Sequence, residues 1–308
     1  MLNFFNRFMP LSPEARAQLA ASQARQAGII NALRTNTVPS GTRARLEASR
    51  DQKVPWLATM TPAELLITRS HGIRPICAVS ATCWLQYGFS WTEGHYQGWM
   101  TALQRLREEA KAAGANAVLD VKMRTLPLNV ENSMDFTLVG TAVRIEGLPP
   151  STDPIIATVP ALEFVKLLEA DVVPTGISIG AHYEWLTDWY GNASRVGFWN
   201  IEAEPLSRLW ETVRYRAHSD LRTHAKGQGN GLLAHINFSE MFEREVENQP
   251  RQYLARFIVI ATIVDAKPGA QFPHDVQIVV DMHAGETPLT GTTPHHQSYA
   301  LNDEDGAI

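Results

Sequence analysis

The segment between Gly94 and Ala113 places its apolar residues at helical spacing. Five of them lie four, three, four and three residues apart and would form one face of a helix: Trp99, Leu103, Leu106, Ala110 and Ala113. Gly114 follows, and glycine commonly ends a helix in the left-handed conformation. The alternating apolar residues from Val118 to Met123 then predict a strand.

A degraded copy of the segment from Arg105 to Val121 recurs at an offset of 115 residues. The matched positions are Ala110-Lys111 with Ala225-Lys226, Gly114 with Gly229, Val118 with Leu233, and Val121 with Ile236. Each copy describes an amphipathic helix, a glycine stop and an apolar strand. The sequence therefore predicts a tandem duplication of one structural unit.

The pattern also predicts the remaining elements of both units. The first unit is expected to have strands at Leu65–Thr68, Ile73–Leu85, Val118–Met123 and Phe136–Ile145. The second is expected to have strands at Phe164–Leu168, Val172–Ile179, Leu232–Phe238 and Phe257–Val264, with a helix from Pro205 to about Lys226. A further strand is predicted at Val276–Met282, and Ser12-Pro13-Glu14 opens a helix that runs to about Leu33.

These elements predict an α+β fold of two tandem β-β-α-β-β domains, with an N-terminal helical arm and a disordered C-terminal tail. The expected boundaries are 1–55 for the arm and a polar linker, 56–148 for the first domain, 149–284 for the second and 285–308 for the tail. Leu148-Pro149-Pro150-Ser151 is the joint between the domains. The tail is polar with few hydrophobic residues, which is typical of disorder.

Charge and cysteine content narrow the function. The net charge of −5 and the isoelectric point near 6.1 argue against a nucleic-acid-binding protein, which is usually basic. Cys77 and Cys83 would lie about 20 Å apart on one extended strand, too far for a disulfide. Free thiols favour a cytoplasmic location. No apolar run reaches the 18–20 or so residues that a membrane-spanning helix needs.

The first residues leave two alternatives open. Phe4, Phe5 and Phe8 could lie in a membrane interface, as short amphipathic anchors do. The other interpretation is an arm that packs on its own protein or on a neighbouring copy, and we favour it.

The motif REEAKAAGANAVLDV, followed after a divergent hairpin by VGTAVRIEG, resembles the YbjQ-like family of small bacterial proteins. The positions that carry the resemblance are Glu108 to Val118 and Gly140 to Val143, and Leu65-Leu66-Ile67-Thr68 is similar to the family's opening strand. The resemblance implies β-β-α-β-β domains that assemble into rings, pentamers among them. The family is labelled "putative heavy-metal-binding". This chain departs from it by its two domains, its N-terminal arm and an aromatic-rich insertion in the second copy.

The metal label directs attention to His71, Cys77 and Cys83, which lie in or near one strand region. There is no CxxC pair and no histidine pair at helical spacing, so a buried thiol beside surface histidines explains these residues better. No GxSxG motif occurs, and the glycines from Gly227 to Gly231 follow a helix, whereas phosphate loops precede one. We expect no catalytic residues, no enzyme activity and no cofactor.

The aromatic insertion is the strongest candidate for an interface or ligand surface. Its members are Tyr183, Trp185, Trp189, Tyr190, Phe198 and Trp199, residue types enriched at interfaces. The alternative is a loop packed over its own sheet. The favoured function is a non-enzymatic scaffold whose domain pair forms a ring as a homo-oligomer, because open sheet edges need covering. The alternative function is a small-ligand or heavy-metal-binding module.

Overall fold

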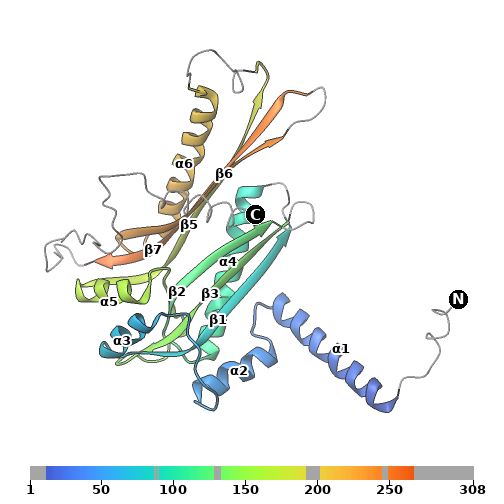
Figure 1. Cartoon of the computed structure of the whole chain (residues 1–308), viewed down its shortest axis with the longest axis vertical. Coiled ribbons are helices and arrows are strands. Elements are labelled where there is room, and N and C mark those ends of the chain that lie inside the picture. Colours follow the sequence, from blue (N-terminus) through green and yellow to red (C-terminus); the bar gives the residue numbers. More distant parts are fainter. Residues whose placement is uncertain are drawn as a thin grey trace, which may run out of the picture.

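The computed structural model describes residues 12–86, 88, 90–127, 133–191, 202–244 and 249–266. It is a mixed α+β structure with two sheets (Figure 1). The first sheet has the order β1-β3-β2-β4, formed by Ile73–Gln86, Ser133–Ile145, Ala117–Pro127 and Ile155–Ile156. The second has the order β5-β7-β6, formed by Val172–Asp188, Arg251–Ala266 and Gly231–Arg244. The helices are α1 Pro13–Arg34, α2 Ser40–Arg50, α3 Pro62–Ser70, α4 Trp91–Ala112, α5 Ala161–Glu169 and α6 Glu204–Ala225.

The N-terminal helix is confirmed, but the predicted linker is partly wrong. α1 begins where expected, with the Ser12 hydroxyl accepting a hydrogen bond from the Ala15 amide. It extends away from the sheets (Figure 1). Residues 34–55 were expected to be a linker, yet they contain α2, whose Leu46 is fully buried in the main core. Leu46 is the one large apolar residue of α2, so no apolar stripe marks this helix in the sequence, and its contact with the core stabilises it.

The predicted opening strands of both units are wrong, because α3 and α5 occupy Leu65–Thr68 and Phe164–Leu168. Thr61 and Glu64 form a capping box at the start of α3, and Pro62 follows the cap. Short apolar runs cannot be assigned to helix or strand from periodicity alone. The order within each unit is therefore α-β-α-β-β.

The three remaining predicted strands of each unit and both long helices are confirmed, and the strands are longer than expected. β5 continues to Asp188, past the predicted end at Ile179, so it includes part of the aromatic segment. The strand predicted at Val276–Met282 and the tail from residue 285 lie outside the described residues. The described residues include no helix long and apolar enough to cross a membrane.

The elements stack in four layers: first sheet, α4, second sheet and α6. The main core joins the first sheet and α4 to residues of β5 and β7, including Ile179 and Ile258. A separate core lies between α6 and the opposite face of the second sheet. α4 is therefore covered on both sides, whereas α6 covers one sheet and leaves its other side exposed.

The order α3-β1-α4-β2-β3 recurs as α5-β5-α6-β6-β7, and matched residues make matched contacts. Asn116 donates from Nδ2 to the Ile145 carbonyl at 3.0 Å and accepts the Ile145 amide at 2.8 Å. Asn230 makes the same pair of bonds with Ala266, at 2.6 and 2.9 Å. Each asparagine joins the start of one strand to the end of the last.

A threonine pair also recurs at equivalent places. The Thr59 amide and hydroxyl contact the Thr141 hydroxyl at 2.8 Å each. The Thr158 amide and hydroxyl contact the Thr262 hydroxyl at 3.0 and 2.8 Å. In both units this pair fastens the segment before the short helix to the last strand.

The strand alignment from sequence was one residue out. Val118 pairs with Ala142 and Leu232 pairs with Ile263, so Val118 corresponds to Leu232 and not to Leu233. The offset is therefore 114 in these strands. The buried helix positions Leu106 and Ala110 still match Leu221 and Ala225 at 115, because the span from Ala225 to Leu232 is one residue shorter than that from Ala110 to Val118.

Side chains cover the outer edge of β1. Arg45 donates to the Ala78 carbonyl, Glu109 accepts the Ser80 amide, and Arg105 donates to the Thr82 carbonyl. Side chains also cover the edge of β5. His224 Nδ1 contacts the Ile179 carbonyl, and the Thr92 hydroxyl accepts the Tyr183 amide. Edge strands covered in this way are blocked from pairing with another chain.

Candidate functional site

Cys77 and Cys83 are buried on the face of β1 that packs against α4. Burial raises the pKa of the Cys77 thiol to about 11. Burial also raises the pKa of Cys83. A metal binds the thiolate, so a raised pKa opposes binding at both residues.

His71 does not join these cysteines. Its Nε2 lies 3.0 Å from Glu169 Oε1, so it links the ends of α3 and α5 at the surface. In the parts of the chain that the structure describes, no group of three or more His, Cys, Asp and Glu residues could hold a metal ion. The residues present do not fit a heavy-metal centre on His71, Cys77 and Cys83.

The first prediction concerns metal content. Protein purified without chelator should contain well under one transition-metal ion per chain, because the thiols are neutral and their surroundings apolar. Elemental analysis of the wild type and of Cys77→Ala measures this directly. Stoichiometric zinc or copper that disappears in Cys77→Ala would contradict the structure-based expectation.

The aromatic candidates that the structure describes lie in different environments, with Trp185, Trp189 and Tyr190 exposed and Tyr183 partly buried. Tyr183 and Trp185 belong to β5, while Trp189 and Tyr190 lie in the exposed turn after it. Phe198 and Trp199 lie outside the described residues, as do Phe4, Phe5 and Phe8. The strand predicted to end at Ile179 continues through the first aromatic residues, and its pairing with β7 extends to Asp188.

Tyr183 takes part in a buried polar network between α4 and the second sheet. The Trp99 indole donates to His95 Nε2 at 2.8 Å, and His95 Nδ1 lies 2.9 Å from the Tyr183 hydroxyl. His95 is fully buried, and desolvation, together with the charge of Arg256, holds its pKa well below its usual range. The imidazole is therefore neutral, with its proton on Nδ1. The network links the two units.

The segment from Trp56 to Met60, before α3, is the counterpart of Ile155 to Val159, before α5. Leu57 is 65% exposed, whereas its counterpart Ile156 is 0% exposed. In the helices that follow, Leu66 is 71% exposed and its counterpart Val165 is fully buried. Apolar positions that the second unit buries against the first are thus exposed on the first.

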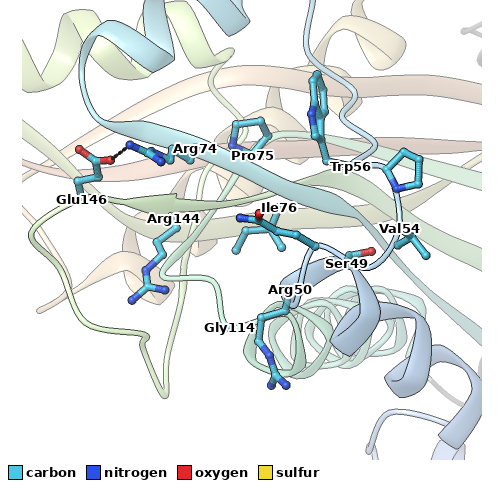
Figure 2. Close-up of a pocket in the computed structure, with 12 residues that line it drawn as sticks. Ser49, Arg50, Val54, Trp56, Arg74, Pro75, Ile76, Gly114, Arg144 and Glu146 are labelled. Atoms are coloured by element: carbon cyan, nitrogen blue, oxygen red, sulfur yellow. Dashed lines mark ion pairs between the residues drawn. The ribbon is translucent and has the colours of Figure 1, made fainter.

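Next to this segment lies a cavity of about 620 Å³, between the end of α2 and the first sheet (Figure 2). Arg50, Arg74 and Arg144 line it, from α2, β1 and β3 respectively. Glu146 is the acidic residue in the lining and pairs with Arg74 at 2.6 Å. Trp56 stands on the connecting segment above them in Figure 2. Arginines and an exposed indole suit an anionic ligand with an apolar part.

A second cavity, of about 670 Å³, lies beside the first and shares Trp56, Arg74 and Pro75 with it. Leu65, Leu66 and Arg69 of α3 line this side. The residues of both cavities and of the His95 network carry no shared motif in the sequence. The arginines are scattered between residues 50 and 144, so only the fold brings them together.

Residues 89–146 match the model of the YbjQ family, whose description is "Putative heavy-metal-binding". The match covers α4, β2 and β3 and stops before the second unit. Comparison with curated proteins and with solved structures gave no match. The comparisons therefore support the family for the first unit, as the resemblance of Glu108 to Val118 implied.

Proposed function

We propose that this chain is a non-enzymatic assembly protein whose two units, both YbjQ-like, associate head to tail with other copies into a ring. The observation that carries the proposal is the contact between the units. The second unit buries Ile156 of its opening segment against the first, while the first unit leaves Trp56 and Leu57 of its own opening segment exposed. Each chain thus forms this contact once internally and has a second, equivalent segment available for the same contact with another copy.

The contact within the chain is an edge addition. Ile155 and Ala157 donate amide hydrogens to the carbonyls of Asn116 and Val118, at 3.1 and 3.0 Å. In return, the amides of Asp120 and Val121 donate to Val159 and Ala157. The segment thereby extends the first sheet beside β2. α5 then packs on the same sheet, with Phe164 and Val165 buried in its core.

The equivalent edge of the second sheet belongs to β6, from Gly231 onward. β6 is the outermost strand of that sheet, and no strand among the described residues pairs with its far side. The counterparts of the Asn116 and Val118 carbonyls are those of Asn230 and Leu232. These groups are placed to receive Trp56 and Ala58 of another copy. Since β1 and β5 have covered edges, β6 is the edge best suited to association.

The free energy available to this contact is modest. Burying the exposed side chains of Trp56, Leu57 and Leu66 contributes roughly 4 kcal/mol before the cost of association. The face of the first sheet that points away from α4 adds little to this free energy. Its residues Ser80 and Thr82 are polar, whereas their counterparts in the second sheet are the apolar Ile179 and Ala181. A micromolar dissociation constant requires about 8 kcal/mol, so the backbone hydrogen bonds at the β6 edge must supply the rest. On that basis we expect an assembly that depends on concentration in the micromolar range.

The second prediction tests this contact. Wild-type protein at tens of micromolar should form a closed oligomer, and the Leu57→Glu/Leu66→Glu variant should be a 34.2 kDa monomer. Both leucines are exposed in one chain, so the substitutions should leave the fold intact. Native mass spectrometry and light scattering coupled to gel filtration give the mass.

Leu148→Glu is the matched control, because Leu148 is also exposed, at 48%, and lies outside the proposed contact. It should assemble like the wild type. A wild type that stays monodisperse at 34 kDa would refute the assembly. An oligomer that survives the double substitution would refute this contact.

The alternative function, a small-ligand or heavy-metal-binding module, has separate support for its two forms. The family description supports the metal form, but the described residues supply no metal-binding group. The arginine-lined cavity supports the ligand form.

A further inference from the structure

The two cavities beside Trp56 form one surface, which we call the arginine groove. It contains Arg50, Arg69, Arg74 and Arg144, from α2, α3, β1 and β3. Its apolar residues include Trp56, Leu65 and Leu66. Four arginines against the single acid Glu146 give the groove a net charge of +3.

Two of these arginines are paired with a neighbouring carboxylate, and two are not paired within the described part of the chain. Arg74 pairs with Glu146, and Arg50 pairs with Asp51 at 3.0 Å. Arg69 and Arg144 make no ion pair with any residue that the structure describes. Their guanidinium groups are exposed and fit bidentate binding of carboxylates.

The matching negative charge lies in the chain's own C-terminal residues. Residues 267–308 contain one lysine and six acidic residues, a net charge of −5 that equals that of the whole chain. Three of the acids are consecutive: Asp303, Glu304 and Asp305. Leu301 and Tyr299 precede them, so an apolar part adjoins the acidic part, as in the groove.

We infer that the arginine groove binds the acidic segment Asp303–Asp305 of this chain. The carboxylates pair with Arg69 and Arg144, and the preceding apolar residues contact Leu65 and Pro75, which also line the groove. β7 ends at Ala266, and the 36 residues from there to Asp303 can span roughly 120 Å when extended. The segment can therefore reach the groove of its own chain or of a neighbouring copy.

Delivery from a neighbouring copy rests on the proposed function. In that assembly, β6 of one copy receives Trp56 of the next, and Asn230 at the start of β6 holds Ala266. The C-terminal residues of one copy thus leave its sheet beside the groove of the next. Binding of the tail in the groove would then make the strength of the assembly contact depend on the charge of the tail.

The third prediction uses a fluorescein-labelled peptide of residues 299–308 and the full-length chain, with binding followed by fluorescence anisotropy. The peptide should bind, and affinity should fall with added salt. The double substitution Arg69→Gln/Arg144→Gln should weaken binding at least tenfold. Arg214→Gln is the matched control, since Arg214 is an exposed arginine on α6, and it should bind as the wild type does.

Competition by the chain's own tail gives a second readout. The full-length variant Asp303→Asn/Glu304→Gln/Asp305→Asn should bind the labelled peptide several-fold more tightly, because its own segment no longer occupies the groove. A peptide with the same three substitutions should not bind. Equal binding by the neutral peptide, or binding unchanged by Arg69→Gln/Arg144→Gln, would overturn the inference. Arginine-dependent binding of pyrophosphate without binding of the peptide would also overturn it, in favour of a small-anion site.

The affinity for the peptide and the mass of the protein are obtained from separate measurements. A monomeric chain that binds the peptide would refute the assembly and leave this inference standing. An oligomer that does not bind the peptide would do the reverse.

Discussion

Substituting Gly180 with alanine is expected to lower the free energy of unfolding by about 3 kcal/mol. Gly180 lies on β5 beneath α6, and an added Cβ would stand 2.0 Å from the Ala217 carbonyl oxygen and 2.8 Å from the Leu221 amide nitrogen. Both are backbone atoms of the helix, so no side-chain rotation can relieve the clash. α6 would have to move away from the sheet and lose part of its core.

Chemical denaturation of the wild type and of Gly180→Ala measures this loss. Gly28→Ala is the control, because nothing lies within 4 Å of a Cβ at Gly28, on the exposed face of α1. It should leave the protein unchanged or up to about 1 kcal/mol more stable. A loss below about 0.5 kcal/mol for Gly180→Ala would show that α6 does not pack this closely.

The second large effect is expected from acid. His95 has a lowered pKa in the folded protein, so below its ordinary pKa of about 6.5 the unfolded chain binds a proton that the folded chain does not. Stability contributed by the neutral imidazole is therefore complete above pH 6.5 and is lost as the pH falls. The slope from this one group is about 1.4 kcal/mol per pH unit.

The hydrogen-bond network of His95 explains why the folded protein opposes protonation of its imidazole. A proton on Nε2 would face the Trp99 indole N–H at 2.8 Å, two donors with no acceptor between them. The charge of Arg256, on β7, opposes a second positive charge. Glu240 pairs with Arg256 and reduces this repulsion, but the desolvation of His95 is the larger cause.

His95→Gln provides the test, since glutamine can accept from Trp99 and donate to Tyr183 without titrating. Denaturation curves between pH 7.5 and 4.5 should fall less steeply for the variant than for the wild type. Acidic groups elsewhere contribute equally to both proteins and cancel in the difference. Parallel curves would show that His95 is protonated in the folded state.

The fold was predictable where the pattern was long. α4 and α6 each show apolar residues on one face over 22 residues, and their ends carry glycine or proline signals. α3 and α5 have 9 residues each, too few to separate a helix from a strand by period, although Thr61-Pro62 with Glu64 was a usable capping signal. α2 has no pattern because Leu46 is its one large apolar residue.

The candidate site was mostly beyond the reach of the sequence. A cysteine among Ile, Ala and Val residues was correctly read as buried, but the partners of His95 lie 4, 41 and 88 residues away along the chain. Tyr183 was selected as an interface residue for its type, and its contact with α4 arises from the packing of the two units. Aligning the two units one residue out of register assigns the residues of β6 to the wrong faces of the second sheet. Only cross-strand pairing could correct it.

The connection from Glu146 to Pro154 stabilises the contact between the two units, because it joins them covalently. It tethers the Ile155 segment within a few residues' reach of β2, so that contact forms at an effective concentration in the millimolar range. Dilution leaves it intact, whereas the same contact between separate chains must compete with the loss of translational freedom. A substitution that weakens the tethered contact therefore does not separate the two units, because the chain keeps them together. In the proposed assembly, identical substitutions at the exposed Trp56 and Leu57 would weaken a contact between separate chains, where no covalent link offsets the loss.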